Sequence, residues 1–293
     1  MLKNMRVLKL HKIVSKLHNG VLKFTQGGNN LKNVLKKHFF VKGRKELSVM
    51  VHNYREKADG TPIVILCHGF TGDKIGPNQL ILNLAKGIEA AGYIAIRFDF
   101  AGSGESYGEF SKDTTISGWQ QDLDTIVSWV KNSPEFSGSP IILCGHSLGG
   151  LIALSYPKDD AIKGRMALSS VVHPVETFSA EGIFGKELWD KAVSGKTISN
   201  FFNKAFTLDD GIFVADMLHG NYKPLEVTDT YSTPLLIIHG TEDCAVPISG
   251  SEELYKRYKG EKVFHKLKGI DHIYINKHHI IQSLIVEWLK KYF

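Results

Sequence analysis

Cysteine is scarce in this sequence, since its 293 residues contain only three: Cys67, Cys144 and Cys244. An odd number of cysteines without closely spaced pairs excludes both a disulfide framework and a cysteine-based zinc site. We therefore expect three reduced thiols. Cys67 and Cys144 each end an apolar run, and we expect both to be buried at neighbouring strand ends. Neither a metal nor an organic cofactor is predicted.

Long apolar runs are also absent. No segment reaches the roughly 18 apolar residues that a membrane-spanning helix needs. Lysine and arginine interrupt the first 17 residues before the apolar core of a signal peptide can form. From these absences we predict a cytoplasmic protein.

Acidic residues are missing from the first 45 positions, which hold twelve of the 36 lysines and arginines. The remaining chain has 24 basic and 30 acidic residues, so its formal charge is −6 although the whole chain carries +6. Proteins that bind nucleic acid carry their positive charge on the folded body. The mildly acidic body therefore excludes nucleic acid as the expected partner.

The basic N-terminal segment has apolar residues at helical spacing over positions 2–24, followed by the breaker TQGGNN. This pattern predicts a basic amphipathic helix within an N-terminal extension that covers residues 1–37. We expect its apolar stripe to pack on the folded body or on a second subunit, which would make the protein a homo-oligomer. Contact with a membrane surface is the alternative.

The rest of the chain alternates between apolar runs and helical segments. Two runs with period two, HFFVKG and LSVMVHNY, flank the turn GRKE and predict a β-hairpin. Six further apolar runs follow: PIVILCHG, YIAIRFDF, PIILCG, GRMALSSVV, PLLIIHG and KVFHKL. Helical periodicity lies at residues 76–91, 116–131, 148–156, 249–258 and 273–292. The alternation predicts an α/β fold in which a mostly parallel sheet of about eight strands has helices on both faces.

One long interval interrupts this alternation. Residues 173–231 are rich in aromatic side chains but contain no clear strand. A segment of this length inside a compact domain is commonly a functional insertion. We predict a small, mostly helical lid over the carboxyl edge of the sheet, inserted in a core formed by residues 38–172 and 232–293.

The sequence GHSLG, Gly145–Gly149, lies between a predicted strand and a predicted helix. It fits the pattern G-x-S-x-G, in which a sharp strand-to-helix turn lifts a serine hydroxyl clear of the sheet while the glycines let neighbouring elements approach. Ser147 is therefore the predicted nucleophile. A serine hydroxyl needs a base to remove its proton and an acid to orient that base.

Candidates for both groups lie at strand ends later in the chain. Asp243 follows the apolar run LLIIHG, and His272 precedes the last predicted helix. The chain order serine, aspartate, histidine is the one expected for a nucleophile turn of this kind. We predict that Asp243 orients His272, with Glu242 as the alternative acid.

An oxyanion hole is the third requirement, because negative charge develops on the substrate oxygen during acyl transfer. The turn HGF can aim the backbone N–H of Phe70 at the site, and the N–H of Leu148 directly follows the nucleophile. We predict these two groups as the donors. Arg97 and Asp99, at the end of another apolar run, are expected to support a turn near the site.

From about His38 to Phe293 the sequence resembles the α/β-hydrolase superfamily and, within it, bacterial cinnamoyl or feruloyl esterases. The resemblance rests on HGFTG, RFDFAGSGES, GHSLGG and the segment LEVTDTYSTPLLIIHGTEDCAVP. It implies a serine carboxylic ester hydrolase that works through an acyl-serine intermediate, carries an inserted lid and needs no cofactor. Several such esterases have glutamine where this chain has Leu148, but the backbone N–H is the predicted donor there.

The substrate that the resemblance implies is a small-molecule hydroxycinnamoyl ester. A roof of flat aromatic rings in the insertion would favour such a planar acyl group. If those rings instead form a small core of the insertion, the expected enzyme is a general short-chain carboxylesterase or a monoacylglycerol-type lipase. A non-catalytic ligand receptor on the same fold is a further alternative.

Overall fold

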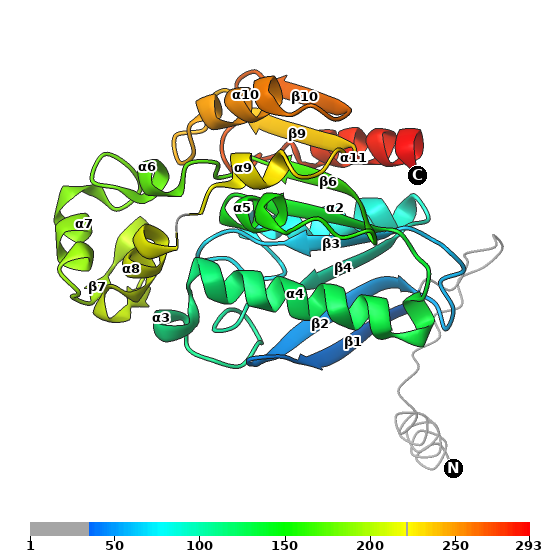
Figure 1. Ribbon diagram of the computed structural model, residues 1–293, viewed down its shortest axis with the longest axis horizontal. Coiled ribbons are helices and arrows are strands. Elements are labelled where there is room, and N and C mark those ends of the chain that lie inside the picture. Colours follow the sequence, from blue (N-terminus) through cyan, green and yellow to red (C-terminus); the bar gives the residue numbers. More distant parts are fainter. Residues whose placement is uncertain (1–34, 221) are drawn as a thin grey trace, which may run out of the picture. The chain divides into compact units, whose positions relative to one another are not determined.

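The structure, a computed structural model, describes residues 35–220 and 222–293 (Figure 1). The predicted amphipathic helix at residues 2–24 lies outside the described residues. Strand β1 (Leu35–Lys42) includes the last three residues of the predicted extension, so the sheet starts earlier than the periodicity indicates.

The core contains one sheet of eight strands in the order β1-β2-β4-β3-β5-β6-β9-β10. Strand β2 pairs antiparallel with β1 and β4, and the other pairings in this sheet are parallel. This confirms the predicted mostly parallel, eight-stranded sheet. Its strands are β1 (Leu35–Lys42), β2 (Glu46–Tyr54), β3 (Ile63–Cys67), β4 (Ile94–Phe98), β5 (Ile141–His146), β6 (Ile162–Leu168), β9 (Leu235–Gly240) and β10 (Lys262–Leu267).

Burial explains why the apolar runs form a parallel sheet. Every residue of β3, β4, β5 and β9 is buried. Strands of this kind need cover on both faces, which the connecting helices provide. The edge strand β1 is mostly exposed and contains three lysines, and charge at an edge discourages pairing with another chain.

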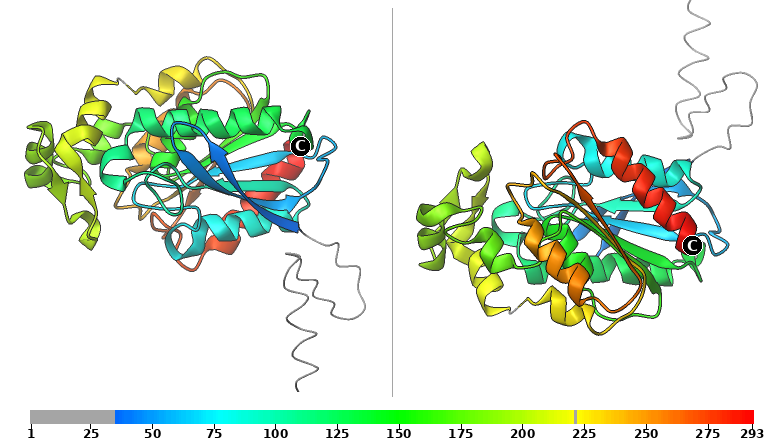
Figure 2. Two further views of the ribbon diagram at one scale, coloured as in Figure 1. Left: turned by 90° about the horizontal axis from the view of Figure 1, so that it is seen from below. Right: turned by 90° about the horizontal axis from the view of Figure 1, so that it is seen from above.

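Helices cover both faces of the sheet, and each view in Figure 2 shows helices on either side of the strands. Helices α2 (Leu80–Ala90) and α11 (His278–Tyr292) share one apolar cluster with the sheet. Helices α4 (Ile116–Asn132), α5 (Leu148–Ser155) and α10 (Ile248–Arg257) pack on the other face. Shorter segments are η2 (Pro77–Gln79), α3 (Phe110–Asp113) and η3 (Pro134–Phe136).

Within the described ranges no helix combines the length and the apolar character needed to span a membrane.

Two predicted helices begin later than their periodicity indicates. The helix predicted at 273–292 starts at His278, because Tyr274 and Asn276 have φ values of 55° and 57°. The helix predicted at 76–91 starts at Leu80, because Asn78 and Gln79 have φ values of 49° and 65°. Residues in the left-handed region cannot belong to a right-handed α-helix. These two turns therefore stay outside the helices.

The segment between β6 and β9 is mostly helical, and α6, α7 and α8 gather at one end of the sheet (Figure 1). Strands β7 and β8 form a short antiparallel ladder that the sequence pattern did not indicate. Helix α9 packs on the core instead, since Leu225 shares an apolar cluster with Leu154 of α5. We propose that the movable part of the predicted lid ends before α9. The elements are α6 (Pro174–Phe178), α7 (Gly185–Val193), β7 (Ile198–Ser199), η4 (Phe201–Asn203), β8 (Thr207–Leu208), η5 (Asp209–Gly211), α8 (Ile212–His219) and α9 (Pro224–Thr228).

The cysteines lie where the sequence predicts. Cys67 and Cys144 are buried and free, and Cys244 is exposed and free. The register of β3 on β5 pairs Cys67 with Gly145 and Leu66 with Cys144, so the two buried thiols lie on adjacent strands. Burial raises the pKa of both thiols, which suppresses the reactive thiolate form.

We expect a small thiol reagent to modify Cys244 alone in the native protein and all three cysteines after unfolding, because only Cys244 is exposed. Mass spectrometry with and without denaturant counts the modified thiols. In the control variant Cys244→Ser the native protein should remain unmodified. Rapid native labelling of Cys67 or Cys144 would contradict the burial argument.

Candidate active site

Ser147 joins β5 to α5 in a backbone conformation that residues with a side chain rarely adopt, with φ of 57° and ψ of −122°. A residue held in this way stores about 1–3 kcal/mol of strain. A Cβ at Gly145 would lie 2.1 Å from the carbonyl oxygen of Gly149, and one at Gly149 would lie 2.3 Å from that of His68. Only glycine fits at these two positions. The sequence GHSLG therefore makes the sharp turn that presents Ser147.

His272 and Asp243 form a hydrogen-bonded pair, with His272 Nδ1 2.8 Å from Asp243 Oδ2. The Asp243 side chain is completely buried, and its Oδ1 accepts hydrogen bonds from the backbone N–H groups of Ala245 and Val246. Burial by itself raises the pKa of this carboxyl, but hydrogen bonds from two histidines and the backbone outweigh it and hold the pKa well below its usual range. Asp243 therefore stays ionised. Glu242, the alternative acid, is exposed.

A pocket of about 410 Å³ brings the predicted groups together, since Ser147, His272 and Phe70 all line it. Within the described part of the chain no hydrogen bond links the Ser147 hydroxyl to His272. Catalytic hydrogen bonds are often long in ligand-free proteins and shorten when substrate binds. The candidate nucleophile Ser147 and the candidate base His272 thus line the same cavity.

The turn that carries Phe70 passes directly against the serine. A Cβ at Gly69 would lie 3.0 Å from Cβ of Ser147, so the two turns pack closely and a side chain at position 69 would crowd the serine. Among residues 35–220 and 222–293, the backbone N–H groups of Phe70 and Leu148 have no acceptor. Two unpaired donors beside one serine can stabilise an oxygen that gains negative charge.

A buried ion pair fixes the next part of this turn. Asp99 accepts hydrogen bonds from the backbone N–H and from Nζ of Lys74, both at 2.5 Å, and from the backbone N–H of Glu105. Arg97 donates to the Lys74 carbonyl oxygen at 3.1 Å. The prediction that Arg97 and Asp99 support a turn near the site is confirmed. Lys74 was missed, although it lies only two residues after HGFTG.

His146 is a second group that sequence reasoning missed. Its Nε2 donates to the backbone carbonyl oxygen of His272 at 2.9 Å. Burial lowers the pKa of His146 to about 3, so the ring is neutral. Because His146 precedes Ser147, this bond ties the nucleophile turn to the loop that carries His272. His146 occupies the first x of G-x-S-x-G. Because the motif accepts any residue there, the sequence does not indicate that its side chain bonds to a residue far along the chain.

Most aromatic rings of the insertion pack on one another. Phe178, Phe184, Phe201 and Phe213 are buried and lie against the ring of Phe70. Phe202 is 44 % exposed and is the aromatic side chain of the insertion that lines the serine pocket. The rings thus form a small core, with one of them available to a ligand.

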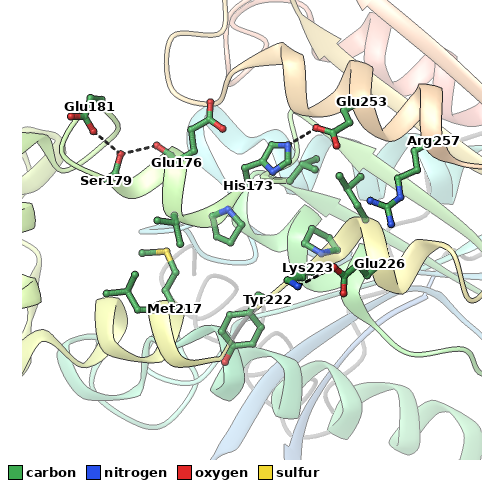
Figure 3. A pocket seen from close by; sticks show the side chains of 16 residues that line it. His173, Glu176, Ser179, Glu181, Met217, Tyr222, Lys223, Glu226, Glu253 and Arg257 are labelled. Atoms are coloured by element: carbon green, nitrogen blue, oxygen red, sulfur yellow. Dashed lines mark hydrogen bonds and ion pairs between the residues drawn. The ribbon is translucent and has the colours of Figure 1, made fainter.

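A larger cavity of about 770 Å³ lies where the insertion joins the core (Figure 3). Its walls contain the paired side chains of His173 and Glu253, with His173 Nε2 2.9 Å from the carboxylate. It includes none of the predicted site residues. Within the described residues no group of three or more His, Cys, Asp or Glu side chains is arranged to hold a metal ion.

Comparison with known proteins identifies the fold. Residues 58–198 match the family model Hydrolase_4, described as "Serine aminopeptidase, S33". Est1E from Butyrivibrio proteoclasticus, solved with ferulic acid bound, superposes with a TM-score of 0.74 at 23 % identity, covering 87 % of this chain and 98 % of Est1E. The chain therefore has the α/β-hydrolase fold, and over residues 58–198 it is similar to this family.

Two curated relatives of this chain carry different names. Protein ABHD12B of Homo sapiens is 27 % identical over 201 residues, which cover 68 % of this chain and 50 % of the human protein. The Monoacylglycerol lipase of Mycolicibacterium smegmatis is 25 % identical over 240 residues, which cover 75 % of this chain and 84 % of the lipase. The chain therefore spans half the length of the human relative and most of the bacterial one.

We expect Lys74→Met to lower the free energy of unfolding by about 3–5 kcal/mol, because it leaves the buried carboxylate of Asp99 without its cation. Urea denaturation followed by circular dichroism measures the change. The matched control is Lys112→Met, which breaks the exposed pair with Glu109 and should leave the free energy of unfolding nearly unchanged. Equal effects of the two variants would show that the Lys74 pair does not hold the turn.

Proposed function

We propose that this α/β-hydrolase is a serine carboxylic ester hydrolase. One observation carries the proposal: the strained Ser147 shares a pocket with His272, whose Nδ1 bonds to the buried carboxylate of Asp243. A nucleophile, a base and an orienting acid in this arrangement are the groups that acyl transfer requires. The Monoacylglycerol lipase among the relatives and the ferulic acid bound to Est1E support ester chemistry.

In the proposed reaction Ser147 Oγ attacks the ester carbonyl carbon while its proton passes to Nε2 of His272. The bond from that carbon to the alcohol oxygen then breaks, and His272 gives the proton to the leaving alcohol. Water next attacks the acyl carbon while His272 takes one of its protons. The bond from that carbon to Ser147 Oγ then breaks, the carboxylic acid leaves and His272 returns the proton to Oγ. Asp243 holds Nδ1–H throughout, which leaves Nε2 free to accept and donate.

The backbone N–H groups of Phe70 and Leu148 are the proposed oxyanion donors. Their contribution does not depend on side-chain chemistry, so leucine in place of glutamine at position 148 leaves the donor intact. Losing one such donor typically costs about 10²–10³ in rate. The unpaired state of both groups within the described residues supports this role.

For the acyl group we propose a small planar one of the hydroxycinnamoyl type. The pocket of about 410 Å³ suits a compact acyl group, and Phe70, Ile183 and Phe202 supply apolar walls. The exposed ring of Phe202 is placed to stack on a planar group. The bound ferulic acid in Est1E supports this choice. General short-chain esterase activity is the second candidate, favoured by the burial of the other rings in the insertion.

Ser147→Ala and His272→Ala are each expected to lower kcat for ester hydrolysis by about 10⁶, because triad members act as a unit. Asp243→Asn should lower it by about 10⁴, because the amide favours the wrong imidazole tautomer. Glu242→Gln is the matched control and should retain wild-type turnover. Labelling by a fluorophosphonate probe, lost in Ser147→Ala, checks the nucleophile directly. A more severe effect at Glu242 than at Asp243 would reverse the assignment of the acid.

Phe202→Leu is expected to lower kcat/KM for methyl ferulate about 2–10-fold and to change that for a butyrate ester less than twofold, because ring stacking favours the planar acyl group alone. Phe206→Leu is the control, since Phe206 packs on Phe110 and does not line the pocket. Steady-state kinetics with both esters give the two ratios. If the wild type hydrolyses the butyrate ester rapidly and methyl ferulate not detectably, the hydroxycinnamoyl proposal is wrong and the protein is a general carboxylesterase.

A further inference from the structure

The carboxylate of Asp243 accepts more hydrogen bonds than the pair with His272 explains. Besides the two backbone N–H groups on Oδ1, a second imidazole reaches Oδ2: Nε2 of His239 lies 3.1 Å away. His239 is the penultimate residue of β9 and its side chain is completely buried. Oδ2 thus lies between two histidines, one on the pocket and one beneath it.

The surroundings of His239 fix where its proton lies. Nε2 also lies 3.1 Å from the carbonyl oxygen of Val246, so two acceptors and no donor face this nitrogen. Nε2 therefore carries a hydrogen. On the other side Nδ1 lies 2.8 Å from Oγ of Ser251, a fully buried residue of α10. In a neutral ring that carries Nε2–H, Nδ1 is an acceptor, and the Ser251 hydroxyl is then its donor.

We propose that His239 is a positioning residue that holds the Asp243 carboxylate toward His272 through its Nε2–H, with Ser251 selecting the tautomer. The inference rests on the proposed roles of Asp243 and His272. The loop from Thr241 to Pro247 connects β9 to α10. From its position in β9, His239 contacts two groups of this loop, the Asp243 carboxylate and the Val246 carbonyl oxygen. Catalytic groups need supporting contacts of this kind to keep productive geometry.

The titratable groups near the carboxylate define what a pH profile reports. His272 and His239 bond to Asp243, while His146 and Tyr274 feel its charge and are buried. Burial lowers the pKa of His146 to about 3 and raises that of Tyr274 beyond the working range, so neither titrates near neutral pH. The acid limb of the profile therefore reports the two histidines bonded to Asp243, and in a variant without His239 it reports His272 alone.

His239→Leu removes the donor and keeps an apolar side chain in the buried site. We expect kcat to fall about 10–100-fold with KM unchanged, the size of a lost hydrogen bond to a charged group. We also expect the acid limb of kcat/KM to move up by about half a pH unit, because a carboxylate with fewer donors attracts a protonated imidazole more strongly. His239→Gln, whose amide N–H can replace Nε2–H, should restore both quantities.

His265→Leu is the matched control, because His265 lies on the neighbouring strand with Ile238 as its register partner and should affect neither quantity. Ser251→Ala gives an independent test should His239→Leu fail to fold, and is expected to move the limb in the same direction by a smaller amount. A folded His239→Leu with kcat within twofold of wild type and an unmoved limb would overturn the proposal. So would a Gln variant as impaired as the Leu variant.

A measurement that needs no substrate separates this proposal from the proposed function. In ¹⁵N-labelled protein, His239 should show a protonated Nε2 and an unprotonated Nδ1, and Ser251→Ala should alter that pattern. If the pattern is found but the wild type hydrolyses no ester, the positioning contact stands and the esterase assignment fails. If His239 shows the opposite tautomer, the positioning proposal fails whatever the activity.

Discussion

The backbone of Gly149 packs so closely on the end of β3 that a Cβ there would lie 2.3 Å and 2.5 Å from the carbonyl oxygens of His68 and Cys67. This contact joins the first turn of α5 to the strand end that continues into the Phe70 turn. Ser147, two residues before Gly149, is thereby held beside Gly69. The nucleophile and the candidate oxyanion donors are thus placed by contacts between backbones, and side chains only complete the arrangement.

The parallel sheet extends this arrangement to the base and the acid. Strands β3, β5 and β9 run in one direction, so the segments after Cys67, His146 and Gly240 leave the sheet at the same edge. The buried carboxylate of Asp243 then needs several donors to remain ionised, because desolvation opposes its charge. Histidines from β9 and from the loop before α11 supply two of them.

The sheet and the candidate triad could be predicted because both depend on local patterns. A fully buried strand reads as an apolar run, and G-x-S-x-G describes a turn five residues long. The contacts of Lys74, His146 and His239 could not be predicted, since each joins a buried polar group to a partner fixed by tertiary packing. The late start of α11 was missed for a related reason: the left-handed residues Tyr274 and Asn276 have no periodic signal.

Phe70 connects the candidate site to the insertion. Phe70 lines the serine pocket, and its ring lies 5.1–6.2 Å from the rings of six other phenylalanines, five of them in the insertion. The two interpretations of the aromatic insertion are therefore not exclusive. The rings form a core, but that core is built on the side chain of a candidate oxyanion residue. Any shift of α6 or α8 changes the packing around Phe70, so the insertion can influence the oxyanion turn without touching the substrate.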